Sequence, residues 1–381
     1  MLINNWYVAA TSEEVTDKPH RTRMVGADFV LFRDDSGMLQ CLSDVCCHRG
    51  GALHRGEING GCIACPYHGW EFNGAGQCTK IPALGDDVTI PKRARIDFYP
   101  VEERMGLVWV FVGDQSEAER PDIPDWFAPF LDNPNWRVTR YNYEWADCNW
   151  ERLCENSIDT AHPSFVHKRF GNRISPKWTT VPIETTEHGA KSARVRAAPA
   201  VSQKRGGIAE TLPKDRKTTK VTLEWSMIAL AEMLYQEMTT EITQVLFSVR
   251  TPVDDNTVRS YGFQARNFLK EPEHDAERLE ALFEAVKEDY DIVRLLKPHH
   301  TVSSNAREML IESDAMELVF RNKVEEWRGL GRYVDGEALE QNGRREVYVA
   351  PSPTRGADPK GWVHQTLPTL LVKKPVSAAA E

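Results

Sequence analysis

The sequence predicts an α+β protein in which an all-β region comes first and a mixed region of helices and strands follows. Two observations carry this prediction. The first third consists of short runs rich in Val, Leu, Phe and Trp between Gly and Asp turns, which is typical of strands. The remainder contains longer segments whose apolar residues recur at helical spacing, together with further strand-like runs.

The strands of the first third set the first domain boundary. Runs of strand length lie at Trp6–Ala10, Phe29–Arg33, Leu39–Leu42 and Leu107–Val112. A polar stretch with several prolines follows the last of them. These signals predict an all-β domain over residues 1–115, a connector over 116–136 and a second domain over 137–381.

The second domain is expected to combine a sheet with several helices. A strand is predicted over Val138–Trp145, and an antiparallel hairpin joins Val245–Thr251 to Arg259–Phe268. Helices are predicted over Cys148–Thr160, Glu273–Leu296 and Asp314–Trp327, the last with Ser313 as its cap. In the longest helix, which Pro298 ends, the residues at helical spacing are Leu279, Leu282, Phe283, Val286, Tyr290 and Val293.

Composition narrows the class of protein. The 381 residues are 41% hydrophobic and 27% charged, as in an ordinary globular protein, and the net charge of −9 argues against nucleic acid as a partner. The N-terminus lacks a basic region followed by a long apolar run, and no run is long enough to cross a bilayer. Eight cysteines fit a reducing compartment better than a disulfide framework, so we expect a cytoplasmic protein.

Two short segments each combine one cysteine with one histidine. Cys46 and His48 form C-x-H, and Cys65 and His68 form C-x-x-H. Two thiolates can hold one iron of a [2Fe–2S] cluster while two imidazoles hold the other. A zinc site can use the same four residues, but zinc loops usually keep like ligands together, and here each loop mixes them. The pattern therefore favours the cluster.

These loops, with their His48-Arg49-Gly50 and His68-Gly69-Trp70 flanks, resemble those of Rieske proteins. Rieske proteins of respiratory complexes join the two loops through an additional disulfide. Gly51 and Tyr67 occupy the positions where those cysteines would stand, so that brace is absent. Its absence points to the oxygenase or ferredoxin branch of the family.

A second motif, D-x-x-H-x-x-x-x-H, contains Asp159, His162 and His167. That spacing alone is weak evidence for a metal site, because two histidines can lie this close by chance. Together with Asn149-Trp150-Glu151 and Glu155-Asn156 upstream, it resembles the corresponding segment of Rieske non-haem iron oxygenases. The resemblance implies that His162 and His167 bind a mononuclear Fe(II), where two imidazoles and one carboxylate leave positions open for dioxygen.

The same resemblance implies two roles for carboxylates. The carboxylate ligand comes from late in the chain at the start of a helix, where Asp314 matches the family position; Glu312, Glu317 and Asp291 are rivals. Asp159 matches the aspartate that bridges an iron-binding histidine to a Rieske histidine of the neighbouring subunit. A carboxylate that accepts N–H bonds from two imidazoles would fix both rings.

The resemblance covers nearly the whole chain and implies a Rieske domain followed by a helix-grip catalytic domain. It further implies a head-to-tail homotrimer that receives electrons from a separate ferredoxin or flavin reductase using NAD(P)H. In agreement, the sequence has no G-x-G-x-x-G after a strand. We expect a terminal oxygenase that hydroxylates or dealkylates a small aromatic or heterocyclic substrate, without a β subunit. Ring dihydroxylation, a Rieske electron carrier with a non-catalytic ligand-binding domain, and a ligand-binding domain with a structural metal stay open.

Overall fold

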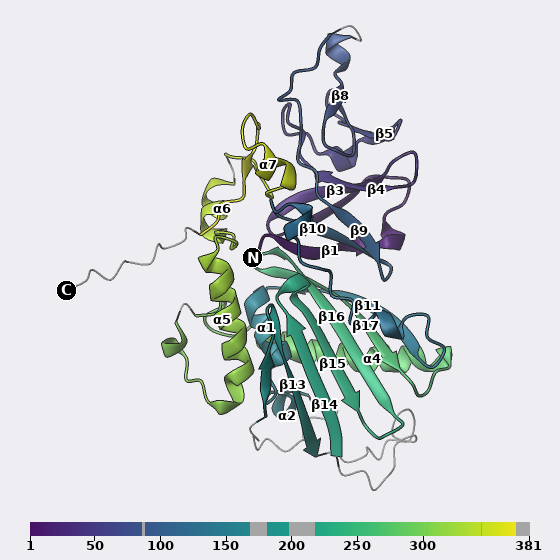
Figure 1. The fold of residues 1–381 in the computed structure, drawn as a ribbon, viewed down its shortest axis with the longest axis vertical. Helices are drawn as coiled ribbons and strands as arrows, with labels where there is room; N and C mark the ends of the chain where they lie inside the picture. The colour runs from purple at the N-terminus through teal and green to yellow at the C-terminus, as the bar shows by residue number, and fades with distance from the viewer. Residues whose placement is uncertain (86–87, 168–180, 198–217, 303, 344, 371–381) are drawn as a thin grey trace, which may run out of the picture. The chain divides into compact units, whose positions relative to one another are not determined.

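The computed structural model describes residues 1–85, 88–167, 181–197, 218–302, 304–343 and 345–370 (Figure 1). The chain forms two compact units. The first contains Met1–Asp122, Pro252–Asp255 and Val324–Glu381, and the second contains Ile123–Thr251 and Asn256–Lys323. The sequence prediction placed residues 137–381 in a single domain. The structure instead groups the residues from Val324 onward with the N-terminal unit.

The N-terminal part of the first unit is built from three small sheets, in the orders β1-β10-β9, β2-β3-β4 and β5-β6-β7-β8. The strands are β1 (Asn5–Thr11), β2 (His20–Met24), β3 (Ala27–Arg33), β4 (Leu39–Ser43), β5 (Glu57–Asn59), β6 (Cys62–Ala64), β7 (Glu71–Phe72), β8 (Cys78–Lys80), β9 (Val101–Arg104) and β10 (Leu107–Val112). All four predicted strands are present. Every residue of β10 is buried, which explains why this strand is an unbroken run of apolar residues in the sequence.

The C-terminal part of the first unit follows α5 (Ala315–Gly329), within which the boundary between the units falls. It contains α6 (Gly336–Asn342), α7 (Pro353–Ala357) and two short parallel strands, β18 (Tyr348–Val349) and β19 (Gln365–Thr366). Polar contacts tie this part to the β domain: the Tyr99 hydroxyl donates to the Ala350 carbonyl at 2.9 Å. Such long-range contacts leave no signal in local sequence patterns.

The second unit contains a seven-stranded sheet in the order β11-β17-β16-β15-β14-β13-β12. Its strands are β11 (Arg137–Ala146), β12 (Ile183–Thr185), β13 (Gly189–Ala197), β14 (Thr218–Ser226), β15 (Ala231–Glu237), β16 (Thr243–Asp254) and β17 (Thr257–Arg266). The predicted hairpin is confirmed, since β16 and β17 are neighbours separated by two residues. The helices are α1 (Trp150–Ile158), α2 (Pro163–Val166), α4 (Asp275–Val293) and the first part of α5.

Helices α1 and α4 lie against one face of this sheet (Figure 1). Phe283 of α4 meets Tyr141 and Tyr143 of β11 edge to face, with ring centroids 6.5 and 6.3 Å apart. On α1, Ser157 accepts a hydrogen bond from Arg250 of β16. The all-β N-terminal part of the first unit and a sheet with helices on one face in the second unit confirm the predicted α+β class.

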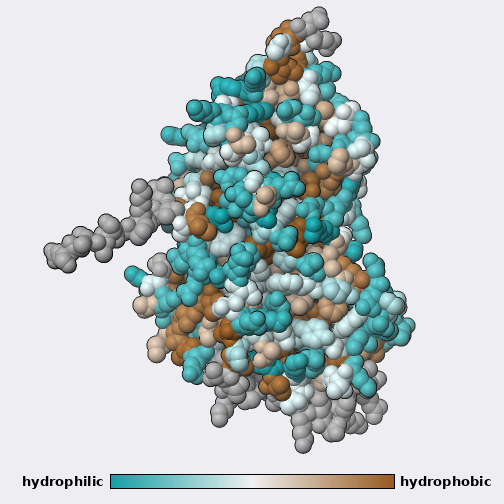
Figure 2. All heavy atoms as spheres, viewed as in Figure 1, coloured by the Kyte–Doolittle hydropathy of each residue, from teal (hydrophilic) through white to brown (hydrophobic). Residues whose placement is uncertain are grey.

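Charged and polar residues dominate the face of the molecule drawn in Figure 2, with small hydrophobic groups between them. Among the described residues, no helix has the length and apolar character needed to span a membrane.

Candidate metal centres

The two cysteine–histidine loops have the same backbone geometry. One connects β4 to β5 and the other connects β6 to β7. In the first, the Gly50 N–H donates to the Cys46 carbonyl at 2.9 Å; in the second, the Gly69 N–H donates to the Cys65 carbonyl at 2.9 Å. Both glycines adopt a left-handed conformation, with φ of 71° and 70°, which favours glycine at these positions. The two C-x-H-type segments thus fold as matching turns.

These turns bury the cysteines and expose the histidines. Cys46 and Cys65 are only 1% and 3% exposed, whereas His48 and His68 are exposed. The two imidazole rings lie 4.5 Å apart between centroids, and His48 stacks on Trp70. The loops approach so closely that a Cβ on Gly51 would lie 2.8 Å from the Cys65 sulfur. The structure therefore brings all four predicted cluster ligands to one end of the β domain.

Both thiols are protonated in the metal-free protein. A hydrogen bond with the Cys47 thiol, together with burial, raises the pKa of Cys46, and burial raises the pKa of Cys65. Buried thiols of this kind become thiolates when a metal ion displaces the proton. Two buried sulfurs beside two exposed imidazoles match the donor set of a Rieske cluster.

The second centre begins at the end of α1. Asn149 caps the start of this helix by accepting the Glu151 N–H at 3.0 Å. Asp159 follows its last turn and accepts the Ala161 N–H at 2.6 Å. The chain then turns into α2, which starts at Pro163, since proline is well tolerated at the first position of a helix. His162 and His167 flank this short helix.

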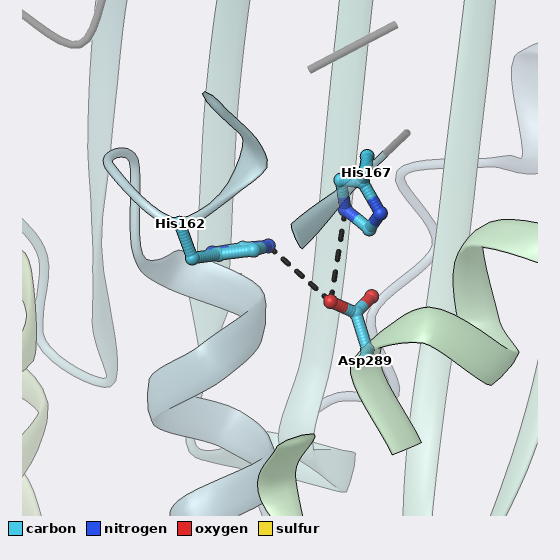
Figure 3. Close-up of side chains that lie close together, drawn as sticks. All are labelled: His162, His167 and Asp289. Carbon is cyan, nitrogen blue, oxygen red and sulfur yellow. Dashed lines mark ion pairs between the residues drawn. The ribbon is translucent and has the colours of Figure 1, made fainter. Parts of the chain in front are cut away.

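The structure brings these two histidines together with Asp289 of α4 (Figure 3). One carboxylate oxygen of Asp289 lies 3.5 Å from Nε2 of His162 and 3.6 Å from Nε2 of His167. The three potential ligand atoms lie within 4.8 Å of one another. Burial raises the pKa of Asp289, against the opposing effect of the two imidazoles. Two imidazoles and one carboxylate are the donor set of a non-haem ferrous site.

The predicted carboxylate ligand, Asp314, is not part of this cluster, and Asp289 replaces it. Asp314 caps its own turn: its carboxylate accepts the Ile311 N–H at 2.8 Å and the Ser313 hydroxyl at 3.1 Å. This local hydrogen bonding gives the aspartate at the start of α5 a structural role.

The rivals to Asp314 do not join the cluster either. Glu312 is exposed, and Asp291 pairs with Lys287 on its own helix. Glu317 is buried, and burial together with the charge of Asp159 raises its pKa to about 8.

A signal for Asp289 exists in the sequence. Leu282, Val286, Asp289 and Val293 follow one another at spacings of four, three and four, so they share one face of the longest predicted helix. An acidic residue within an otherwise apolar stripe is costly to bury unless it has a charged partner. The position of Asp289 on the apolar face of the helix therefore indicates a functional role, whereas an acidic residue as such does not.

Further carboxylates hold the two imidazoles from behind. Nδ1 of His162 lies 3.4 Å from Asp159, and Nδ1 of His167 lies 3.3 Å from Glu288. Burial opposes ionisation of Asp159, but hydrogen bonds from His162 and the Ala161 N–H outweigh it and lower its pKa. Carboxylates in this position fix the tautomer and orientation of metal-binding histidines. Glu288 was not predicted.

A buried network of two arginines and two glutamates fixes α1 in place. Arg152 binds Glu155 at 3.2 Å and Glu308 at 2.7 Å, while Arg321 of α5 binds the same two glutamates at 2.6 and 2.7 Å. Each charge in the network has two partners of opposite sign, so burial leaves none uncompensated. The helix that carries Asp159 at its end is thereby locked to α5.

Two family models match the chain in this order. The Rieske [2Fe-2S] domain matches residues 5–99, and the vanillate O-demethylase oxygenase C-terminal domain matches residues 146–329. The chain combines a Rieske [2Fe-2S] domain with the C-terminal domain of an oxygenase. Both centres described above therefore lie in the segments that define a Rieske oxygenase.

Curated Rieske oxygenase components share part of the sequence. The chain is 38% identical over 170 residues to the iron–sulfur subunit of a toluene-4-sulfonate monooxygenase system from Comamonas testosteroni, covering 44% of this chain and 47% of that protein. It is 38% identical over 165 residues to the oxygenase component of dicamba O-demethylase from Stenotrophomonas maltophilia, covering 43% and 47%. The matches thus span about half the length of these relatives.

Solved structures share the fold over most of the chain. Dicamba monooxygenase bound to 3,6-dichlorosalicylic acid aligns with a TM-score of 0.72 at 24% identity, covering 87% of this chain and 98% of that one. A Pseudomonas putida CBB5 NdmA variant with caffeine aligns with a TM-score of 0.69 at 22% identity, covering 86% and 91%. At this identity the likeness establishes the fold.

Proposed function

We propose that this chain is the terminal oxygenase of a multicomponent system. Cys46, His48, Cys65 and His68 would hold a Rieske [2Fe–2S] cluster. His162, His167 and Asp289 would hold a mononuclear Fe(II). The observation that carries the proposal is the convergence of two imidazole Nε2 atoms on one carboxylate oxygen, at 3.5 and 3.6 Å, downstream of the Rieske loops.

When bound, a cluster of this type carries single electrons, and ferrous iron with two histidines and one carboxylate activates dioxygen. The protein residues keep the donors in place for that chemistry. Asp159 and Glu288 hold the Nδ1 side of each imidazole, so that both Nε2 atoms face Asp289. Asn156 donates to Asp289 at 3.5 Å and orients the carboxylate.

We also propose a homotrimer in which Asp159 bridges to the Rieske centre of a neighbouring subunit. The exposure of His48 and His68 supports this, because their ring nitrogens are accessible to another chain. Asp159 already faces His162, and its lowered pKa keeps it an ionised acceptor for a second imidazole N–H. A separate ferredoxin or flavin reductase would supply the electrons, and the eight free cysteines support a cytoplasmic location.

The reaction we propose is monooxygenation of a small aromatic substrate, with hydroxylation or demethylation as the outcome. Relatives named for toluene-4-sulfonate, dicamba and vanillate support this class. All three names describe a substituted aromatic ring with an acidic group.

The test is substrate-dependent consumption of NADH and dioxygen by the purified protein with added reductase. A panel of aromatic acids and N-methyl heterocycles, read by product mass, should give a product that has gained one oxygen or lost a methyl group. His162→Ala should abolish the product while the visible spectrum of the cluster persists. Product formation by His162→Ala at the rate of the parent protein would refute the proposed site.

A further inference from the structure

The C-terminal segment of residues 348–367, here called the strap, is bound to the β domain beside the first cluster loop. It comprises β18, α7 and β19 and was not expected to approach the Rieske centre. Without a bracing disulfide, the cluster loops depend on non-covalent contacts with the rest of the chain. All eight cysteines are free in this protein, so the brace cannot be a disulfide.

The strap is anchored at a buried carboxylate. Asp97, only 1% exposed, accepts hydrogen bonds from the Ser352 hydroxyl at 2.7 Å and from Arg355 at 2.7 and 2.9 Å. This two-pronged arginine–carboxylate contact is strong and directional. Asp97 is itself tied to the cluster region, because its carbonyl accepts the Ser43 N–H at the end of β4, three residues before Cys46.

At a second anchor, two guanidinium groups lie over the Trp362 ring. The Arg95 and Arg355 carbons lie 4.0 and 4.5 Å from its ring centroid. Arg95 also binds Asp358 at 2.8 Å and the Lys360 carbonyl at 2.6 Å. Stacking of arginine on tryptophan is the most favourable form of cation–π contact. These contacts leave little freedom to the stretch of strap that follows.

That stretch places His364 on the first cluster loop. Nε2 of His364 lies 3.4 Å from the Cys46 carbonyl oxygen, and Arg355 holds the His364 carbonyl at 2.9 Å. A carbonyl oxygen only accepts, so Nε2 carries the proton in this contact.

We propose that the strap holds the first cluster loop in place, and that His364 is a positioning residue for the Rieske cluster. This inference rests on the proposed function, since it concerns the cluster that Cys46 would hold. By donating to the Cys46 carbonyl, His364 fixes the loop that carries a thiolate ligand. The positive end of its N–H dipole beside Cys46 would favour the reduced, more negative state of a bound cluster.

The test compares His364→Phe, which removes the donor and retains the bulk, with His364→Gln, which retains a donor. Two quantities are measured: the rate at which visible absorption is lost in the presence of EDTA, and the midpoint potential of the cluster. His364→Phe should lose its cluster about fivefold faster, the factor that corresponds to one net hydrogen bond of about 1 kcal/mol, and its potential should fall. His364→Gln should stay within about twofold of the parent.

Val363→Ala is the matched control, because Val363 is the exposed neighbour in the strap. If His364→Phe takes up no cluster, Trp362→Ala is measured in its place. This variant removes an anchor of the strap that does not contact the cluster loop, and it should also speed cluster loss. Parent-like rates and potentials in His364→Phe, or in Trp362→Ala where it decides, overturn the inference. A parent protein without any Rieske spectrum would instead refute the proposed function itself.

Discussion

Replacement of Asp289 by asparagine should remove the mononuclear iron and spare the cluster. The carboxylate oxygen lies 3.5 and 3.6 Å from the two imidazole nitrogens. It is the one anionic donor of the three-residue group, because the other two donors are imidazoles. Loss of a residue that merely supports a metal ligand typically costs 10- to 100-fold in metal affinity. Loss of a charged ligand should exceed this, giving at least about 100-fold, or about 2.7 kcal/mol.

The substitution should act on metal binding more than on folding. Burial raises the pKa of Asp289, which shows that the metal-free protein gains little from its negative charge. The denaturation midpoint of the iron-free protein should therefore change little. Asp314→Asn makes the same chemical change at the start of α5, where the side chain only caps a turn, and is the matched control.

The assay is iron and acid-labile sulfide per chain after dialysis against a chelator. The parent and Asp314→Asn should retain cluster iron plus one mononuclear iron, and Asp289→Asn only the cluster iron. The reverse pattern, with iron lost from Asp314→Asn and retained by Asp289→Asn, would refute the reasoning from geometry.

Four other substitutions test individual contacts. Asp159→Asn should keep both metals but slow reoxidation of the reduced cluster at least about tenfold in rapid-mixing experiments, and an unchanged rate would exclude the bridge. Glu288→Gln should weaken ferrous iron binding about tenfold by titration, because the support at 3.3 Å behind His167 loses its charge; equal affinity would contradict this. Gly51→Ala should lower visible absorption per chain, since its Cβ would meet a ligand sulfur at 2.8 Å, and full cluster content would disprove the close approach. Burial opposes ionisation of Asp275, but hydrogen bonds from Arg137 and Arg266 outweigh it and lower its pKa. The ionised carboxylate therefore stabilises the fold above about pH 4, and this stabilisation is lost as the pH falls further. Asp275→Asn should lower the free energy of unfolding by about 3 kcal/mol at pH 7, because it leaves buried Arg266 without this carboxylate, and the difference from the parent should shrink in acid. A denaturation difference independent of pH would contradict that assignment.

Local patterns predicted the elements well where one face or both faces of a segment are buried. Leu107–Val112 is a strand with the predicted ends, because a fully buried strand is an unbroken apolar run. The longest helix was predicted within a few residues of its observed Asp275–Val293. Motif spacing likewise placed His162 and His167 together, since five residues cannot separate them far in space.

Long-range contacts were beyond the reach of those patterns. The proposed third ligand lies more than a hundred residues after His167, and the packing of α4 against α1 selects Asp289 from several acidic residues. Asp314 resembled a ligand by position, yet its local capping bonds satisfy the carboxylate. The strap reaches the first cluster loop through Arg355 and Asp97, which lie 258 residues apart. No periodicity encodes such a pair.

The claim on which this account depends is that one chain holds two separate iron centres. Crystals of the aerobically purified protein, measured at the iron absorption edge, test it most directly. The account predicts a strong anomalous peak between Cys46 and Cys65 and a second, weaker peak bounded by His162, His167 and Asp289. A map with density at the first position only, or with the second peak beside Asp314, would contradict it.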